Sequence, residues 1–165
     1  MADPTAPGGS TAPNQNRADC GLRPSACVAR DVGGMLRGVN LRPTRQRIAL
    51  GRLLYAKGDR HVTAEMLHEE AMRARVPVSL ATVYNTLHQF TEAHLLREVV
   101  VDSARTYFDT NVSDHHHFFL ENSGSLMDID GDRIAVTGLP QAPDGTDVAR
   151  VDVIVRLQGA PRQAS

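Results

Sequence analysis

Apolar residues recur at helical spacing through the middle of the chain. Three helices are predicted there, over about residues 44–57, 63–75 and 79–90, and a shorter helix is predicted from about Met35. Thr44, Thr63 and Ser79 stand where the longer helices begin, and residues of this type are preferred as N-caps. The expected inward-facing residues are Ile48, Leu50, Leu53 and Leu54 in the first helix, Met66, Leu67 and Met72 in the second, and Leu80, Val83, Leu87 and Phe90 in the third.

Strand patterns follow these helices. Residues 95–101 and 104–109 are two strand-like runs with Asp102 and Ser103 between them, which predicts a hairpin. Three helices followed by a hairpin form a winged helix-turn-helix, in which the last helix lies in the major groove of DNA and the wing touches the backbone. Three short helices with a polar face also describe many packing domains, so this pattern alone leaves both interpretations open.

The second half of the chain predicts a small sheet. Residues 115–120, 125–129 and 148–157 are strand-like. A segment of about 65 residues with so little apolar surface is marginal as an independent domain, so a homodimer is expected, which would present two recognition helices to a two-fold symmetric site. The fold class is therefore predicted as mixed α/β (α+β), with a disordered tail at 1–34, a winged-helix DNA-binding domain at 35–110 and a small α/β dimerisation and ligand-sensing domain at 111–165.

The composition is that of a globular protein. The 165 residues are 41% hydrophobic, which is enough for a core. The chain has no apolar run long enough to span a bilayer and no secretory signal at its start, so no membrane association and a cytoplasmic location are expected. Cys20 and Cys27 both fall in the predicted tail, so a disulfide framework is not expected.

The formal net charge of −1 conceals two opposed halves. Residues 36–97 carry ten Lys/Arg against five Asp/Glu, whereas residues 98–165 carry five against eleven. A basic half attracts phosphate and an acidic half is repelled by it, so this split would orient the molecule on a polyanion. The alternative is that both are ordinary solvated surfaces.

The polar face of the helix that begins at Ser79 carries hydroxyl, amide and aromatic groups that can meet base edges or a thymine methyl group. Three arginines at the start of the first long helix also favour DNA, because guanidinium groups suit phosphate and narrow-groove contacts. A solvated helix end would explain these arginines nearly as well. The candidate DNA-binding residues are Arg42, Arg45, Arg47, Ser79, Thr82, Tyr84 and Asn85.

Three consecutive histidines fall in a predicted strand. Side chains alternate along a strand, so His115 and His117 share one face and His116 lies on the other. Two imidazoles can therefore converge on one ion or on a haem iron. Nitrogen and carboxylate ligands suit iron, manganese or zinc, neutral imidazole is equally an axial haem ligand, and spacing does not separate these options. The alternative is a polar strand edge. The candidates to complete a metal site are His61, Asp109 and Asp128.

Several stretches together resemble the ferric uptake regulator family over residues 41–157. They are LRPTRQR at 41–47, HVTAE at 61–65, SLATVY at 79–84 and the histidine triplet. Within the family, YFDTN at 107–111 before the triplet, LEN at 120–122 after it and VARVDV at 148–153 resemble the haem-responsive iron response regulator branch.

This resemblance implies a dimeric transcription regulator, mainly a repressor, of genes for iron and haem metabolism. Its implied partners are a double-stranded DNA operator, a second copy of the chain, haem and a haem-delivering protein. Tyr84 would contact bases, and Arg42 and Arg47 would contact the groove and backbone. In metal-binding members the positions that match His61, Asp109, His115 and His117 form one site, with Asp128 as a candidate fifth ligand, whereas in the haem-responsive branch the residues linked to haem are His115, His116 and His117.

Two departures from the family pattern concern cysteine. Most members carry a Cys-x-x-Cys pair for structural zinc where this chain has Leu120 and Ser123, which excludes that thiolate site. Some iron response regulators have a Cys-Pro haem motif with a nearby His, but here Val28 and Arg30 follow Cys27. Cys27 remains a candidate haem ligand through its thiolate, with an idle thiol as the alternative, and the histidine triplet becomes the main candidate sensor.

No catalytic signature accompanies these motifs. The sequence has no HExxH helix, nucleophile elbow or phosphate loop, so an enzyme is not expected. Two rivals to the haem-sensing interpretation remain. One is a regulator that senses divalent iron, manganese or zinc directly, and the other is a metal-dependent hydrolase, which would need an open metal position beside a placed base.

Overall fold

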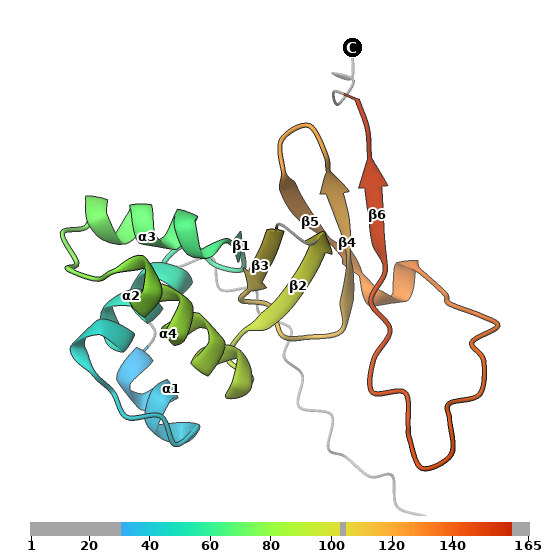
Figure 1. Cartoon of the computed structure of the whole chain (residues 1–165), viewed down its shortest axis with the longest axis horizontal. Coiled ribbons are helices and arrows are strands. Elements are labelled where there is room, and N and C mark those ends of the chain that lie inside the picture. Colours follow the sequence, from blue (N-terminus) through green and yellow to red (C-terminus); the bar gives the residue numbers. More distant parts are fainter. Residues whose placement is uncertain (1–30, 103–104, 160–165) are drawn as a thin grey trace, which may run out of the picture.

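The computed structural model describes residues 31–102 and 105–159. The described part is a mixed α/β fold, as predicted, with the helices gathered on one side and two three-stranded sheets on the other (Figure 1). The helices are α1 (Val32–Gly38), α2 (Arg45–Tyr55), α3 (Ala64–Arg73) and α4 (Leu80–Glu92), with a 3-10 turn, η1, at Gly131–Arg133. The strands are β1 (His61–Val62), β2 (Arg97–Asp102), β3 (Arg105–Asp109), β4 (His115–Leu120), β5 (Ser125–Asp130) and β6 (Ile154–Leu157).

The three longer helices begin at their predicted N-caps. The side-chain oxygens of Thr44, Thr63 and Ser79 each accept a hydrogen bond from the backbone N–H three residues further on. These bonds satisfy amide donors that have no partner within the helix. The helices enclose one apolar core, whose fully buried members include Leu36, Leu50, Leu54, Leu67, Val83, Leu87 and Phe90.

Helix α1 starts at Val32, so the expected start at Met35 is wrong, and so is the predicted tail at residues 32–34. The rest of that tail, 1–30, lies outside the described residues. Asp31 caps the helix by accepting from the backbone N–H of Gly34 at 2.9 Å. Val32 is buried against Gly51 of α2, where an added Cβ would meet Val32 Cγ1 at 2.6 Å. The sequence does not predict this start because residues 33 and 34 are glycines, which weaken a helical signal.

The inward face predicted for α3 is partly wrong. Met66 and Met72 are 45% and 57% exposed, whereas the small residues Ala64 and Ala71 are buried on either side of Leu67. Their spacing of three and four residues defines the true buried face, and the alanines allow a close approach to the core. Leu80, at the first position of α4, is also exposed rather than buried.

The first sheet has the strand order β1-β3-β2 and contains the predicted hairpin. In the antiparallel pairing of β1 with β3, His61 lies opposite Asp109 and Val62 lies opposite Phe108. Phe108 is fully buried in the helical core. The pair Val62 and Phe108 therefore holds β1 against the core. The adjacent pair places His61 beside Asp109.

The second sheet has the order β5-β4-β6, with β4 and β5 antiparallel and β4 and β6 parallel. The third predicted strand is shorter than expected, because only Ile154–Leu157 of residues 148–157 is strand. Before Ile154 the segment is held by one backbone hydrogen bond, in which the His117 N–H donates to the Val153 carbonyl at 3.0 Å, and by side chains. Asp152 pairs with Arg97 and with Arg150, and the backbone N–H of Val153 donates to His116 Nδ1 at 3.4 Å.

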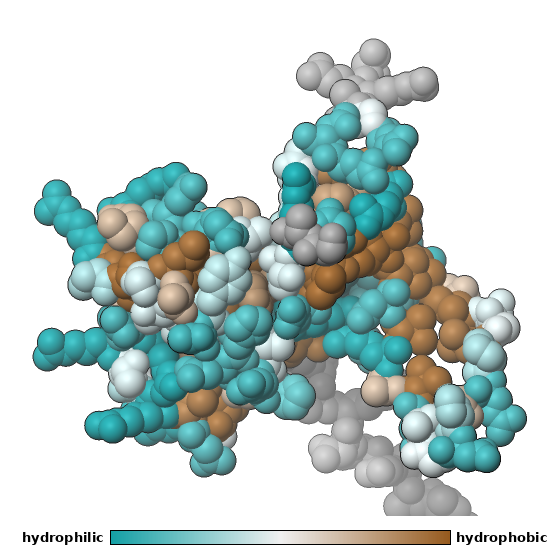
Figure 2. Space-filling model, in the orientation of Figure 1, coloured by the Kyte–Doolittle hydropathy of each residue, from teal (hydrophilic) through white to brown (hydrophobic). Residues whose placement is uncertain are grey.

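A small apolar cluster joins the two sheets. It contains Val99, Val101 and Tyr107 of the hairpin together with Phe119 of β4. Figure 2 shows apolar atoms gathered over β4 and β6, while hydrophilic atoms cover most of the helical half. Met127 and Leu157 are among the exposed apolar residues of the second sheet. Among the described residues, no helix combines the length and apolar character needed to cross a bilayer.

Candidate functional site

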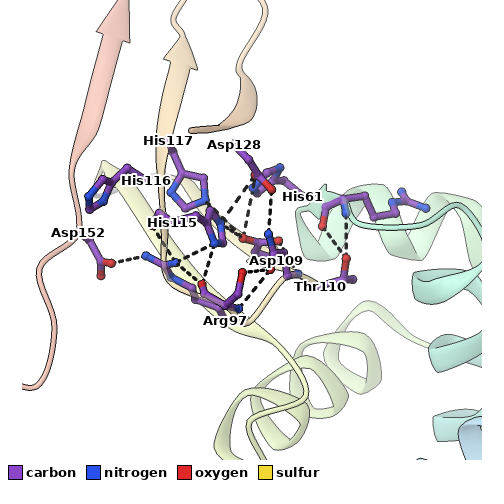
Figure 3. Close-up of polar contacts among 12 residues, drawn as sticks. His61, Arg97, Asp109, Thr110, His115, His116, His117, Asp128 and Asp152 are labelled. Atoms are coloured by element: carbon purple, nitrogen blue, oxygen red, sulfur yellow. Dashed lines mark hydrogen bonds and ion pairs between the residues drawn. The ribbon is translucent and has the colours of Figure 1, made fainter. Parts of the chain in front are cut away.

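Five side chains from four strands meet where the two sheets join (Figure 3). One ligand atom from each lies within 4.8 Å of all the others. The imidazoles of the cluster are largely buried and Asp109 is completely buried, whereas the side chain of Asp128 is 33% exposed. The members are His61 of β1, Asp109 of β3, His115 and His117 of β4, and Asp128 of β5, which is the metal-ligand set expected from the sequence.

Asp109 is the centre of this cluster. Its Oδ2 atom lies 2.8 Å from His115 Nε2, 3.3 Å from His117 Nε2 and 3.4 Å from His61 Nε2. Asp128 Oδ1 lies 3.0 Å from His61 Nε2 and 3.7 Å from His115 Nε2. Three imidazole nitrogens and two carboxylate oxygens thus point at one small volume.

The chemistry of this donor set fits a divalent cation. The Nε2 atoms of His115 and His117 are 3.0 Å apart, so at most one of them can carry the proton between them. His61 Nε2 is buried and makes no regular hydrogen bond within the described residues, although it lies 3.0 Å from Asp128 Oδ1 and 3.4 Å from Asp109 Oδ2. Buried nitrogens without a partner are uncommon unless they bind something. Imidazole and carboxylate ligands together suit iron, manganese or zinc.

Groups behind the cluster fix the orientation of its members. His115 Nδ1 lies 2.8 Å from the carbonyl oxygen of Ser113, and donation of a proton there leaves Nε2 as the ligand atom. Asn111 donates its backbone N–H to Asp109 at 2.8 Å and its side-chain amide to Asp128 at 3.1 Å. The guanidinium of Arg97 contacts the backbone carbonyl of His115 at 3.1 Å and pairs with Asp152.

Burial by itself would raise the pKa of Asp109. Close contacts with the imidazoles of His117 and His61 and the hydrogen bond from the backbone N–H of Asn111 outweigh that effect and hold the pKa well below its usual range. The carboxyl group is therefore ionised at neutral pH. A permanent negative charge at the centre of three imidazoles is suited to binding a cation.

His116 does not belong to this cluster. It is half-buried on the opposite face of β4, where its Nδ1 accepts from the backbone of Val153. The predicted split of the triplet into two faces is thus confirmed. The role of His115, His116 and His117 in haem binding is not tested by this arrangement and stays a prediction. Cys20 and Cys27 both lie outside the described residues.

The candidate DNA-binding residues surround the N-terminal ends of α2 and α4. Arg42 and Arg45 are exposed, whereas Arg47 is half-buried and donates to Gln89 at 2.7 and 3.0 Å. Arg47 also donates to the carbonyl of Arg42 at 2.8 Å. Arg47 therefore ties the segment before α2 to the side of α4.

The polar face of α4 is open. Ser79 Oγ lies 2.9 Å from Thr82 Oγ1 as well as capping the helix, and Asn85 is exposed. Tyr84 is 37% exposed, and its hydroxyl donates to Glu65 of α3 at 2.6 Å. Thr82 and Asn85 line a shallow hollow of about 230 Å³ together with residues from the start of α2. The structure thus brings Arg47, Thr82 and Asn85 to one hollow, and the role of all seven candidates in DNA binding stays a prediction.

Sequence patterns missed the residues that support these sites. Arg97, Asn111 and Asp152 hold the metal-ligand cluster, and Glu65 and Gln89 hold Tyr84 and Arg47. Arg97 offered one signal, because an arginine at a buried position of an alternating strand needs a partner. The others act through contacts between distant positions of the chain, which local patterns do not encode.

The sequence is similar to that of known transcription regulators. A profile of the ferric uptake regulator family matches residues 38–154. The chain is 35% identical over 130 residues to ferric uptake regulation protein 1 of Mycolicibacterium fortuitum, a match that covers 75% of this chain and 77% of the relative. It is 36% identical over 94 residues to the peroxide operon regulator of Bacillus subtilis, covering 56% of this chain and 63% of that protein.

Solved structures agree in fold. The ferric uptake regulator from Pseudomonas aeruginosa with manganese matches with a TM-score of 0.60 at 22% identity, covering 78% of this chain and 98% of that one. A zinc-bound manganese uptake regulator matches with a TM-score of 0.58 at 17% identity, covering 78% and 98%. At such identities the likeness establishes the fold alone.

Proposed function

The chain belongs to the ferric uptake regulator family, and from this premise we propose that it is a DNA-binding transcription regulator whose DNA affinity depends on a divalent metal ion. The observation that carries the proposal is the cluster of three imidazoles and two carboxylates at the junction of the two sheets. The named relatives are regulators, which fits the expectation that the chain is not an enzyme.

His61, Asp109, His115, His117 and Asp128 are the residues that would hold the ion. A bound iron, manganese or zinc ion would balance the negative charge of the two carboxylates and accept the lone pairs of the imidazoles. The buried Nε2 of His61, which makes no regular hydrogen bond among the described residues, would bind the ion. One relative in the family was solved with manganese and another with zinc, in line with this donor set.

The position of His61 supports a link between this cluster and DNA. His61 lies on β1, and two residues later Thr63 caps α3, which packs beside α4. His117 and Asp128 lie on the second sheet. Fixing His61 against these residues would therefore fix the start of α3, and with it α4, relative to the second sheet. We expect this to favour one spacing of the helices and to tighten DNA binding.

The double-stranded operator would meet the basic half of the chain. The exposed guanidinium groups of Arg42 and Arg45 would contact phosphates, and Tyr84 and Asn85 on α4 would contact base edges. A homodimer formed through the second half would present two copies of α4 to a two-fold symmetric site. Exposed apolar residues on the second sheet, such as Met127 and Leu157, support that assembly.

Haem sensing is the finer prediction, and it rests on the resemblance to the iron response regulator branch. Two other predictions rest on the same resemblance. They are the control of iron and haem genes and the haem-delivering partner. In the cluster, the Nε2 atoms of His115 and His117 are 3.0 Å apart and buried, which leaves room for an ion, whereas a haem macrocycle would need the sheets to open. Direct metal sensing is therefore the function that the geometry supports best.

The test begins with selection of a preferred duplex from a randomised DNA pool, because the operator is not known. Its affinity for the full chain is then measured by fluorescence anisotropy with the protein chelated, loaded with Mn²⁺ or loaded with haem. We expect Mn²⁺ to strengthen binding at least tenfold, a difference of about 1.4 kcal/mol. His117→Ala should abolish this response, whereas His116→Ala, on the opposite face, should keep it.

Equal affinity for chelated and Mn²⁺-loaded wild type would contradict metal sensing. If haem instead changes the affinity, gives a Soret band and loses its effect in a variant with Ala at all three triplet positions, the haem-sensing alternative replaces it. Failure to enrich any duplex would contradict DNA recognition itself.

A further inference from the structure

The hydroxyl of Tyr84 is held by a carboxylate from a neighbouring helix. Tyr84 lies in the second turn of α4, and its hydroxyl donates to Glu65 Oε1 at 2.6 Å. Glu65 lies in the first turn of α3. The ring of Tyr84 also stacks on His88, one turn further along α4, with centroids 6.4 Å apart and an interplanar angle of 22°. Two contacts from different directions therefore fix this partly exposed ring.

The hydroxyl of an exposed tyrosine can donate to water, but here it donates to a carboxylate. A hydrogen bond from a hydroxyl to an ionised carboxylate is short and strong compared with a neutral one. It restricts the torsions of both side chains before any ligand arrives, so less freedom is lost on binding. It also occupies the only proton of the hydroxyl, so the ring rather than the hydroxyl donor is left to meet a base.

We propose that Glu65 is a positioning residue for DNA recognition, which holds Tyr84 so that the face and edge of its ring are presented to the bases. An aromatic ring in this role suits the methyl group of a thymine. The carboxylate would also repel phosphates from this part of the surface and so disfavour non-specific binding. This inference rests on the proposed DNA-binding function and assigns to that function a residue outside the seven candidates.

The charge states of both partners fit this role. The hydrogen bond from Tyr84, followed by a backbone hydrogen bond, lowers the pKa of Glu65, so the carboxylate is ionised at neutral pH. The same bond to Glu65 raises the pKa of Tyr84, so the hydroxyl keeps its proton. A negative charge in the first turn of α3 is further favoured by the helix dipole.

A matched control exists on the same helix. Glu69, one turn further along α3, is also exposed and carries the same charge, but it pairs with Arg73 at 3.0 Å and does not touch Tyr84. Glu69→Ala therefore reports the effect of losing one negative charge from α3. Neither Glu65 nor Glu69 is buried, so their replacement leaves the core of the protein intact.

The experiment uses the duplex selected from a randomised pool and a scrambled duplex of the same length. The ratio of their dissociation constants is measured for the full chain and for Glu65→Ala, Glu65→Gln, Tyr84→Phe, the double variant Glu65→Ala/Tyr84→Phe, and Glu69→Ala. Circular dichroism and a Co²⁺ titration verify that each variant is folded. Because base contacts are worth about 1–3 kcal/mol, we expect Glu65→Ala to lower the ratio about tenfold.

The other variants separate this interaction from the effect of charge. Tyr84→Phe should lower the ratio as Glu65→Ala does, and the double variant should lose no more than either single variant, because both changes remove one interaction. Glu65→Gln should keep most of the ratio, since its amide oxygen accepts the same bond. Every variant that loses a negative charge should bind the scrambled duplex more tightly. Glu69→Ala should tighten binding to both duplexes alike and so leave the ratio unchanged.

An unchanged ratio in Glu65→Ala would overturn the proposal. So would losses that multiply in the double variant, or a Glu65→Gln protein as poor as Glu65→Ala. A wild-type protein that does not distinguish the two duplexes would instead contradict the proposed DNA-binding function.

Discussion

Glu70→Gln is expected to lower the free energy of unfolding, because it breaks a charge-assisted contact that holds the approach to β1. The two carboxylate oxygens of Glu70 accept from the guanidinium of Arg60 at 2.6 and 3.0 Å, and Lys57 Nζ lies 3.6 Å away. The side chains of Arg60 and Glu70 are only 14% and 19% exposed. The backbone carbonyl of Arg60 accepts from the backbone N–H of Thr110, and the backbone N–H of Arg60 donates to the Thr110 hydroxyl, so the contact connects α3 with the strands beside it.

The magnitude follows from this intermediate burial. Exposed ion pairs contribute about 0–1 kcal/mol, whereas removing one partner of a fully buried pair costs about 3–5 kcal/mol. For a largely buried pair with two hydrogen bonds, and a substitution that keeps the shape and one acceptor, the expected loss is about 2 kcal/mol at pH 7. Glu69→Gln is the control, since its pair with Arg73 is exposed and should contribute less than about 0.5 kcal/mol.

The effect should depend on pH. Hydrogen bonds from Arg60 lower the pKa of Glu70 in spite of burial, which acts in the opposite direction, and the charges of Arg60 and Lys57 add to the lowering. Because the pKa is lower in the folded than in the unfolded chain, the contribution is complete above the unfolded value of about 4.3 and is lost as pH falls through the folded value. The difference between wild type and Glu70→Gln should therefore shrink below about pH 4.

Urea unfolding followed by circular dichroism measures this difference. Protein concentration must be held constant, because a dimer gains stability with concentration. A change in midpoint at constant slope reports stability alone. A loss below about 0.5 kcal/mol at pH 7, or a difference that persists undiminished at pH 3, would show that the charge of Glu70 does not stabilise the fold.

Three other substitutions test separate parts of the structure. Asp109→Asn removes the charge at the centre of the ligand cluster, so a Co²⁺ titration should show at least about a hundredfold weaker binding; unchanged affinity would place the metal elsewhere. Phe90→Ala empties a fully buried position of the helical core and should cost about 3–5 kcal/mol in urea unfolding, whereas a loss under 1 kcal/mol would contradict the packing. Arg42→Ala removes an exposed guanidinium, so the slope of log affinity against log salt should flatten by about one unit; an unaltered slope would show that Arg42 makes no phosphate contact.

Local chemistry made much of the fold predictable. The N-caps at Thr44, Thr63 and Ser79 act within three residues, so each can be recognised from its own neighbourhood. The division of the histidine triplet follows from the alternation of a strand, which needs no knowledge of the rest of the molecule. The choice of His61, Asp109 and Asp128 as their partners depended on residue type, and the register of the strands brings all three to His115 and His117.

The remaining features depend on what packs against each segment. Met66 and Met72 are apolar enough to suggest a buried face, but the two alanines of α3 lie against the core because they permit a closer approach. Residues 148–153 alternate as a strand would, yet Asp152 is held by Arg97 and Arg150, so pairing with β4 begins only at Ile154. The partnership of Glu65 with Tyr84 joins two helices across nineteen positions, a contact that only the fold creates.

In the proposed regulator, the metal site and the DNA-binding surface are coupled. Coupling between two sites is reciprocal, so a metal that strengthens operator binding must itself bind more tightly to the operator complex, by the same factor. The most direct measurement is therefore a Co²⁺ titration of the full chain with and without a saturating amount of the selected duplex. We expect at least tenfold tighter Co²⁺ binding in the presence of the duplex, and the same Co²⁺ affinity with and without DNA would show that the two sites are not coupled.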